Sequence, residues 1–175
     1  MKDASRRIRS EGMTGAAVSA VMQDAGLTHG GFYKHFGSKN DLLMESLSEA
    51  FQEITDRLTR VAEQAKPGTA WKAIVTTYLS QEFCDNVEHG CPLPVLAPEL
   101  ARADKSMRPQ IFEELKKYKD QMQPFMPGRR AADKERAFFC IFSTMIGAME
   151  IARMLPEPFK QKVLASVRDH LLQSF

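Results

Sequence analysis

The sequence predicts an all-α protein, with a three-helix helix-turn-helix domain at the amino end and a helical body behind it, about nine helices in all. Apolar residues recur at spacings of three and four along most of the chain, whereas the alternating pattern of strands is nearly absent. Proline and glycine residues divide this pattern into segments of helix length. With 43% hydrophobic residues in 175, the chain can bury a core.

Three short helices are expected at the amino end. The first covers about residues 2–9 and ends near Gly12, and the second covers about residues 18–24 and stops at Gly26. Thr28 then caps a third helix, because its side-chain oxygen can accept an early backbone N–H group. This order of helix, turn and short helix is typical of a DNA-binding unit.

A long helix is expected to follow from Ser38. The sequence Ser-Lys-Asn-Asp resembles a capping box, in which the hydroxyl and the Asp41 carboxylate satisfy early backbone donors. One apolar stripe then continues until Pro67-Gly68 and consists of Leu47, Phe51, Ile54, Leu58, Val61 and Ala65.

The body is predicted to contain further helices separated by proline. A fifth helix is expected over residues 69–83, and Pro98 keeps the segment after Gly90-Cys91-Pro92 short or kinked. The remaining helices are expected over about residues 107–122, 132–155 and 159–171.

Charge and cysteine content narrow the cellular setting. The net charge is +2, but the first 39 residues carry +3 and the remainder −1, which suits a small DNA-facing domain on a neutral body. The three cysteines are few and odd in number, which argues against a disulfide framework and favours a reducing cytoplasm. No apolar run approaches the ~20 residues of a membrane span, and the charged opening has no apolar signal segment behind it. We therefore expect a cytoplasmic protein without a membrane partner.

Residues 25–43, AGLTHGGFYKHFGSKNDLL, concentrate the groups that a DNA-reading element needs. Gly26 permits the turn, and Thr28 caps the recognition helix and brings a hydroxyl near a phosphate. Gly30 and Gly31 weaken the helix but let its backbone approach DNA closely, while His29 is the candidate for a base edge. The predicted DNA contacts are Ser19, Thr28, His29, Gly30, Gly31, Tyr33, Lys34, His35 and Lys39.

This segment resembles the TetR family of bacterial transcriptional repressors. The matching positions are Ala25, Gly26, Thr28, Gly30, Phe32, Tyr33, His35, Phe36, Ser38, Lys39 and Leu42. Two features depart from the family pattern: Ala17 stands where Thr or Ser is usual, and few residues precede the first helix, so a basic arm for the minor groove is expected to be missing. The resemblance implies a DNA-binding domain over residues 1–45 and a ligand-binding and dimerisation domain over residues 46–175.

The resemblance also implies a homodimer that binds a palindromic DNA operator. The last two helices of each subunit are then expected to form a four-helix seam, which the apolar face of the penultimate helix and the small Gly147 permit, although such a face also suits an ordinary buried helix. The predicted seam residues are Phe138, Ile141, Phe142, Met145, Gly147, Met149, Val163, Val167 and Leu171.

A small-molecule inducer pocket between the long helices is implied as well. Its candidate lining residues, each of which also suits a plain core position, are Trp71, Tyr78, Phe83, Phe112, Tyr118, Met145 and Met149. Neither a cofactor nor a metal is expected to be required.

Three alternatives remain open at this stage. Cys84, His89 and Cys91 form a Cys-x4-His-x-Cys cluster that suits a metal or a thiol-based redox sensor, but four zinc ligands at standard spacing are absent from the sequence. A dimeric ligand-binding or adaptor protein with weakened DNA binding is motivated by Ala17. An enzyme is not favoured, because the chain has neither a phosphate-binding glycine loop nor a nucleophile elbow nor a His-Glu-x-x-His pair.

Overall fold

The computed structural model describes residues 1–15 and 36–175, and in these two ranges the chain forms helices and turns without a strand. The predicted second and third helices fall on residues outside these ranges. The described elements are α1 (Lys2–Gly15), α4 (Lys39–Glu63), α5 (Ala70–Tyr78), α6 (Gln81–Asp85), η1 (Val87–His89), α7 (Leu93–Ala101), α8 (Arg108–Met122), η2 (Gln123–Phe125), α9 (Ala131–Arg153) and α10 (Phe159–Ser174).

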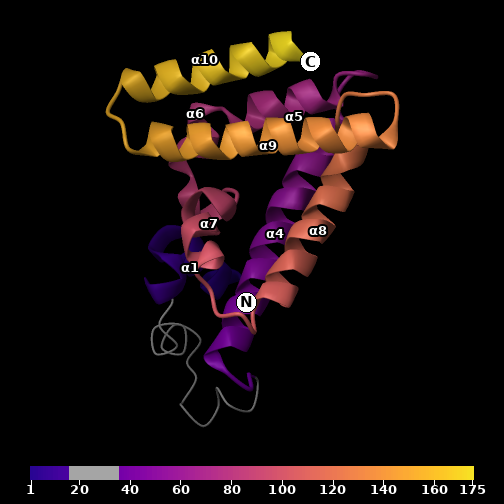
Figure 1. The fold of residues 1–175 in the computed structure, drawn as a ribbon. Helices are drawn as coiled ribbons and strands as arrows, with labels where there is room; N and C mark the ends of the chain where they lie inside the picture. The colour runs from indigo at the N-terminus through magenta and orange to yellow at the C-terminus, as the bar shows by residue number, and fades with distance from the viewer. Residues whose placement is uncertain (16–35) are drawn as a thin grey trace.

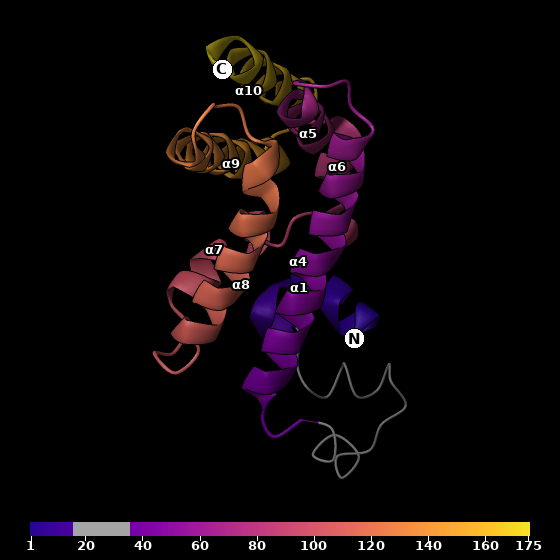
Figure 2. The same cartoon turned by 90° about the vertical axis from the view of Figure 1, so that its right-hand side faces the viewer.

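The helices form two groups. Figure 1 shows α9 and α10 running side by side across one end of the molecule, with α5 packed beside them. α4 and α8 run together from that end toward the amino-terminal segment, and α7 lies between α9 and α1 (Figures 1 and 2). One apolar core connects these elements, from Ile8 in α1 to Leu171 in α10.

α1 is kinked at Gly12, where the sequence predicts that the first helix ends. Gly12 has φ 76°, a left-handed backbone conformation that favours glycine, and the helix resumes at once to reach Gly15. Ile8 is buried against the body, so this helix is anchored on the core rather than extended into solvent.

α4 begins where its cap was predicted. The Ser38 hydroxyl accepts a hydrogen bond of 3.1 Å from the Asp41 backbone N–H group, which satisfies one of the free donors of the first turn. Leu47, Ile54 and Leu58 of the predicted stripe are almost completely buried. α4 continues without interruption across the predicted domain boundary at residues 45 and 46.

The predicted single helix over residues 69–83 is wrong. The chain forms α5 as far as Tyr78 and then a separate α6 that begins at Gln81. Ser80 causes the break, because its hydroxyl accepts the Phe83 N–H group at 3.1 Å and so caps a new helix. A single serine cap does not interrupt the regular spacing of the apolar residues around it, so the sequence pattern did not indicate this break.

The remaining body helices follow the predicted layout. α7 is a helix of nine residues that contains Pro98, and α9 and α10 are separated by Pro156 and Pro158. The start of α9 is held by Asp133, whose carboxylate accepts hydrogen bonds from the backbone and the guanidinium of Arg130. In the part of the chain that is described, none of the helices combines the length and apolarity that crossing a bilayer requires.

Candidate ligand pocket and nucleic-acid interface

Of the nine predicted DNA contacts, the structure places Lys39. Its side chain is exposed in the first turn of α4, directly after the Ser38 cap. A cation there extends from the end of α4 that follows the predicted recognition segment. Ser19, Thr28, His29, Gly30, Gly31, Tyr33, Lys34 and His35 lie outside the described residues.

An apolar pocket of about 550 Å³ opens between α8 and α9. Leu93, the first residue of α7, also contributes to its wall. The lining residues are Leu93, Phe112, Leu115, Lys116, Tyr118, Lys119, Glu135, Phe138, Phe139, Phe142, Ser143 and Ile146. Such a volume with mostly aromatic and aliphatic walls is typical of small-molecule sites.

Polar groups occupy part of the pocket wall. The Lys119 ammonium donates to Glu135 Oε1 at 2.8 Å and also lies 3.0 Å from Asp120 Oδ1, so its charge is already balanced. Lys116 is exposed on the same helix. The pocket therefore offers an aromatic interior, one neutralised ion pair and one further cation to a ligand.

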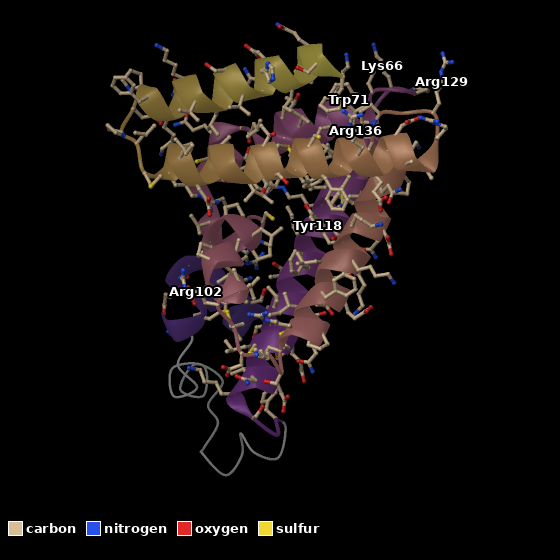
Figure 3. All side chains as sticks on the ribbon, viewed as in Figure 1. Lys66, Trp71, Arg102, Tyr118, Arg129 and Arg136 are labelled. Atoms are coloured by element: carbon tan, nitrogen blue, oxygen red, sulfur yellow. The ribbon has the colours of Figure 1, made fainter. Side chains whose placement is uncertain are left out.

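Two of the seven predicted ligand residues line this pocket. Phe112 is 61% exposed on α8, and Tyr118 is nearly buried below α9, where Figure 3 labels it. The other five residues are not among the lining residues but form part of the core, and they are Trp71, Tyr78, Phe83, Met145 and Met149. Helical spacing identified them correctly as buried, but it does not indicate whether an aromatic side chain meets protein or a ligand.

The pocket is bordered by residues that the sequence reasoning assigned elsewhere. Phe138 and Phe142 were predicted for the dimer seam, yet they form an aromatic cluster with Tyr118, with ring centroids 6.2 and 5.3 Å from its own. Leu115, Phe139 and Ile146 also line the pocket, but the sequence reasoning did not select them. The sequence does show an apolar face on each of the helices α8 and α9, but it does not show that these two faces meet.

Most of the predicted seam residues are inside the subunit. Six are at most 7% exposed, so they offer a second subunit no surface, and they are Phe138, Ile141, Phe142, Met145, Met149 and Leu171. Val163 and Val167 pack partly against the same core. These residues were assigned to the seam because α9 is apolar around most of its circumference. The sequence pattern does not distinguish the inner side of such a helix from its outer side.

A different stripe of α9 faces outward. Cys140, Thr144 and Ile151 are exposed, and they follow one another at spacings of four and seven with Gly147 between them. A Cβ atom built at Gly147 meets nothing within 4 Å, so this point of the stripe is open. Gly147 is therefore a predicted seam residue that lies on this outward-facing stripe of α9.

A buried polar group lies next to the pocket wall. The Cys91 thiol is adjacent to the hydroxyls of Tyr78 and Tyr118, and burial raises the pKa of all three groups. Burial also raises the pKa of the Cys84 thiol, against the opposing effect of Arg153. Both thiols are consequently protonated at neutral pH, which is the unreactive form.

The Cys-x4-His-x-Cys cluster does not form a metal site. Cys84 and Cys91 are buried, whereas His89 is exposed on η1. Throughout residues 1–13 and 36–175, no group of three or more His, Cys, Asp or Glu side chains is placed to hold a metal ion.

Thiol labelling checks this description of the cysteines. In a Cys140→Ser variant, which removes the exposed thiol, we expect no rapidly reacting thiol in the native protein at pH 7 and two in denaturant. The two remaining thiols should react at least about a hundredfold more slowly in the folded than in the unfolded chain. A rapid native reaction at Cys84 or Cys91 would instead favour a redox-sensing role.

The all-helical fold is shared with solved structures of bacterial transcription regulators. A regulator from Chloroflexus aurantiacus has TM-score 0.77 and 22% identity, over 98% of this chain and 89% of that one. Escherichia coli NemR in its reduced form has TM-score 0.74 and 16% identity, over 98% and 93%. Bacillus subtilis FadR in complex with stearoyl-CoA has TM-score 0.67 and 20% identity, over 99% and 97%. At these identities the likeness shows a shared fold.

Residues 1–45 match bacterial regulatory proteins of the tetR family. No curated protein matches the sequence. The resemblance to the TetR family is therefore confirmed on two grounds, the amino-terminal family match and a fold shared with TetR regulators along nearly the whole chain.

Proposed function

We propose that the protein is a homodimeric transcriptional repressor that binds a palindromic DNA operator and is released by a small molecule bound between α8 and α9. One combined observation carries this proposal. A family-matched DNA-binding segment over residues 1–45 is joined to a body that holds an open apolar pocket of about 550 Å³.

The predicted contacts within residues 19–39 would carry DNA recognition. Thr28, Tyr33 and Lys39 are assigned to phosphates, and His29 is assigned to a base edge. The exposed position of Lys39 at the start of α4 supports its assignment, because a cation there remains available to a backbone phosphate.

The outer stripe of α9 would form the centre of the dimer seam, together with α10. Gly147 allows two α9 helices to approach closely, and Ile151, which is 48% exposed, supplies apolar area beside it. To bind a palindromic operator, such a dimer would have to present its two recognition helices about 34 Å apart, one turn of DNA.

The ligand is proposed to be predominantly apolar. Phe112, Leu115 and Phe139 are each at least 36% exposed in the pocket wall, so a bound aromatic or aliphatic group would remove their surface from water. Release of DNA then requires the ligand to bind more tightly to the form that does not fit the operator.

Salt-dependent DNA binding tests the assignment of Lys39. We expect Lys39→Ala to weaken binding to all sequences alike and to make the salt dependence shallower by about two, one lost phosphate contact for each subunit. Lys66→Ala is the matched control, because Lys66 follows the opposite end of α4 at the top of Figure 3 and should leave the slope unchanged. His29→Ala, in contrast, should alter which sequence is preferred; equal losses on all sequences would contradict its assignment to a base.

The protein must first select a DNA sequence from a random library. If the dimer selects none at low salt, the adaptor alternative motivated by Ala17 replaces the repressor.

Filling the pocket tests the ligand proposal. Compounds with aromatic or alkyl groups are screened for those that raise the melting temperature, and Leu115→Trp is expected to abolish the increase by occupying the apolar space. Glu113→Trp is the matched control, since Glu113 borders a separate hollow between α4 and α8. A compound that stabilises wild type and Leu115→Trp equally binds elsewhere.

A further inference from the structure

α7 connects the pocket to the amino-terminal domain. Leu93 at its start lines the pocket, whereas Glu99 near its end touches α1. Figure 1 shows α7 lying between α9 and α1 in this way. Leu93 and Glu99 therefore lie near opposite ends of one helix of nine residues.

Glu99 holds α1 at its break. The Met13 backbone N–H group donates to Glu99 Oε2 at 2.9 Å, just after Gly12. The carboxylate also occupies the space beside Gly12, where a Cβ atom would overlap with Oε1. The carboxylate thus satisfies a backbone donor that the break at Gly12 leaves free.

Arg9 of α1 makes a second contact, with the loop that precedes α7. Its Nη1 donates to the Gly90 carbonyl oxygen at 3.3 Å, and its side chain is completely buried. The other guanidinium nitrogens bind Ser5 and Glu53, so Arg9 joins α1, α4 and this loop. Gly90 is only three residues from Leu93 in the pocket wall.

Arg153 of α9 lies beside the same loop. Its Nε donates to the Cys84 carbonyl oxygen at 3.1 Å, and its guanidinium reaches the space beside Gly90. The loop is therefore hydrogen-bonded to Arg9 of α1 and lies beside Arg153 of α9.

We propose that α7 and the Gly90 loop position the amino-terminal domain through Glu99 and Arg9, and that a ligand that displaces Leu93 alters DNA affinity by shifting these two contacts. The ligand and DNA steps rest on the proposed function. Glu99 and Arg9 are positioning residues, because each acts through the backbone of α1 or of the loop rather than on DNA.

Hydrogen exchange of the full-length protein tests the positioning step without DNA or ligand. Glu99→Ala is expected to speed exchange in the peptide that contains Met13 by about tenfold, the effect of one lost hydrogen bond to a charged acceptor, while α4 exchanges as in wild type. Glu99→Gln keeps an acceptor oxygen and should remain within about twofold of wild type. Glu113→Ala, an exposed carboxylate on α8, is the control. If Glu99→Ala lowers the melting temperature of the whole chain, Glu99→Asp replaces it, because it keeps the charge but retracts the carboxylate.

Leu93→Trp imitates a ligand by adding bulk at the pocket end of α7. We expect it to speed exchange at Met13 in wild type but to add little in the Glu99→Ala background, because both changes act through the same contact. The proposal would be overturned if the effects of Leu93→Trp and Glu99→Ala on exchange at Met13 add fully, or if Glu99→Ala leaves that exchange unchanged.

DNA affinity is the separate functional readout. Glu99→Ala should weaken DNA binding about tenfold and Glu99→Gln should restore it. Wild-type protein that binds no DNA would refute the proposed function yet leave the exchange result intact. Normal DNA affinity in Glu99→Ala would refute the positioning role.

Discussion

Replacing Arg9 by methionine is expected to lower the free energy of unfolding by about 3 kcal/mol. Its guanidinium makes hydrogen bonds to Ser5, Gly90 and Glu53, and the side chain is 0% exposed. Methionine fills much of the same volume but leaves the Gly90 carbonyl and the Ser5 hydroxyl without this donor. Glu53 is 27% exposed and can be rehydrated, which keeps the loss below that of a fully enclosed pair.

Arg7→Met is the matched control, two residues away on the same helix. Arg7 pairs with Glu11 at 3.5 Å, and both side chains are accessible to solvent, so its loss should cost less than about 1 kcal/mol. Urea unfolding followed by circular dichroism measures both variants. Similar midpoints for Arg9→Met and Arg7→Met would contradict the role assigned to Arg9.

Gly147→Arg is expected to separate the dimer into folded monomers and to reduce operator affinity by at least about a hundredfold, because each monomer then binds one half-site without its linked partner. The subunit itself should tolerate the change, since a Cβ atom at this position has open space around it. Sedimentation measures the mass, and Cys140 adds a second readout: its thiol lies on the same stripe and should react faster in the monomer than in the dimer.

Gly147→Ala separates bulk from backbone effects. Alanine should leave the dimer intact and stabilise α9 by up to about 1 kcal/mol through its higher helix propensity. A Gly147→Arg variant that remains dimeric and keeps its DNA affinity would place the seam elsewhere.

Local signals made the helix boundaries predictable from sequence. Ser38 caps α4, and the break in α1 falls at Gly12, because a hydroxyl cap and a positive φ each depend on one residue and its immediate neighbours. Ser80 is the exception, since its capping role was hidden inside a regular apolar pattern.

The positions of pocket and seam were less predictable, because periodicity reports burial and not the identity of the neighbour. Phe142 and Met145 were both assigned to the seam, yet one borders the pocket and the other belongs to the core. The Glu99 contact with Met13 joins residues 86 positions apart, and no local pattern in the sequence indicates such a pairing.

DNA binding is measured for the wild-type dimer on its library-selected duplex and on a scrambled duplex, both at one salt concentration of about 0.15 M. A dimeric repressor should bind the selected duplex at least about a thousandfold more tightly, with two chains on each duplex. Equal affinity for the two duplexes, or one chain on each, would contradict the assignment of this protein as a dimeric reader of DNA sequence.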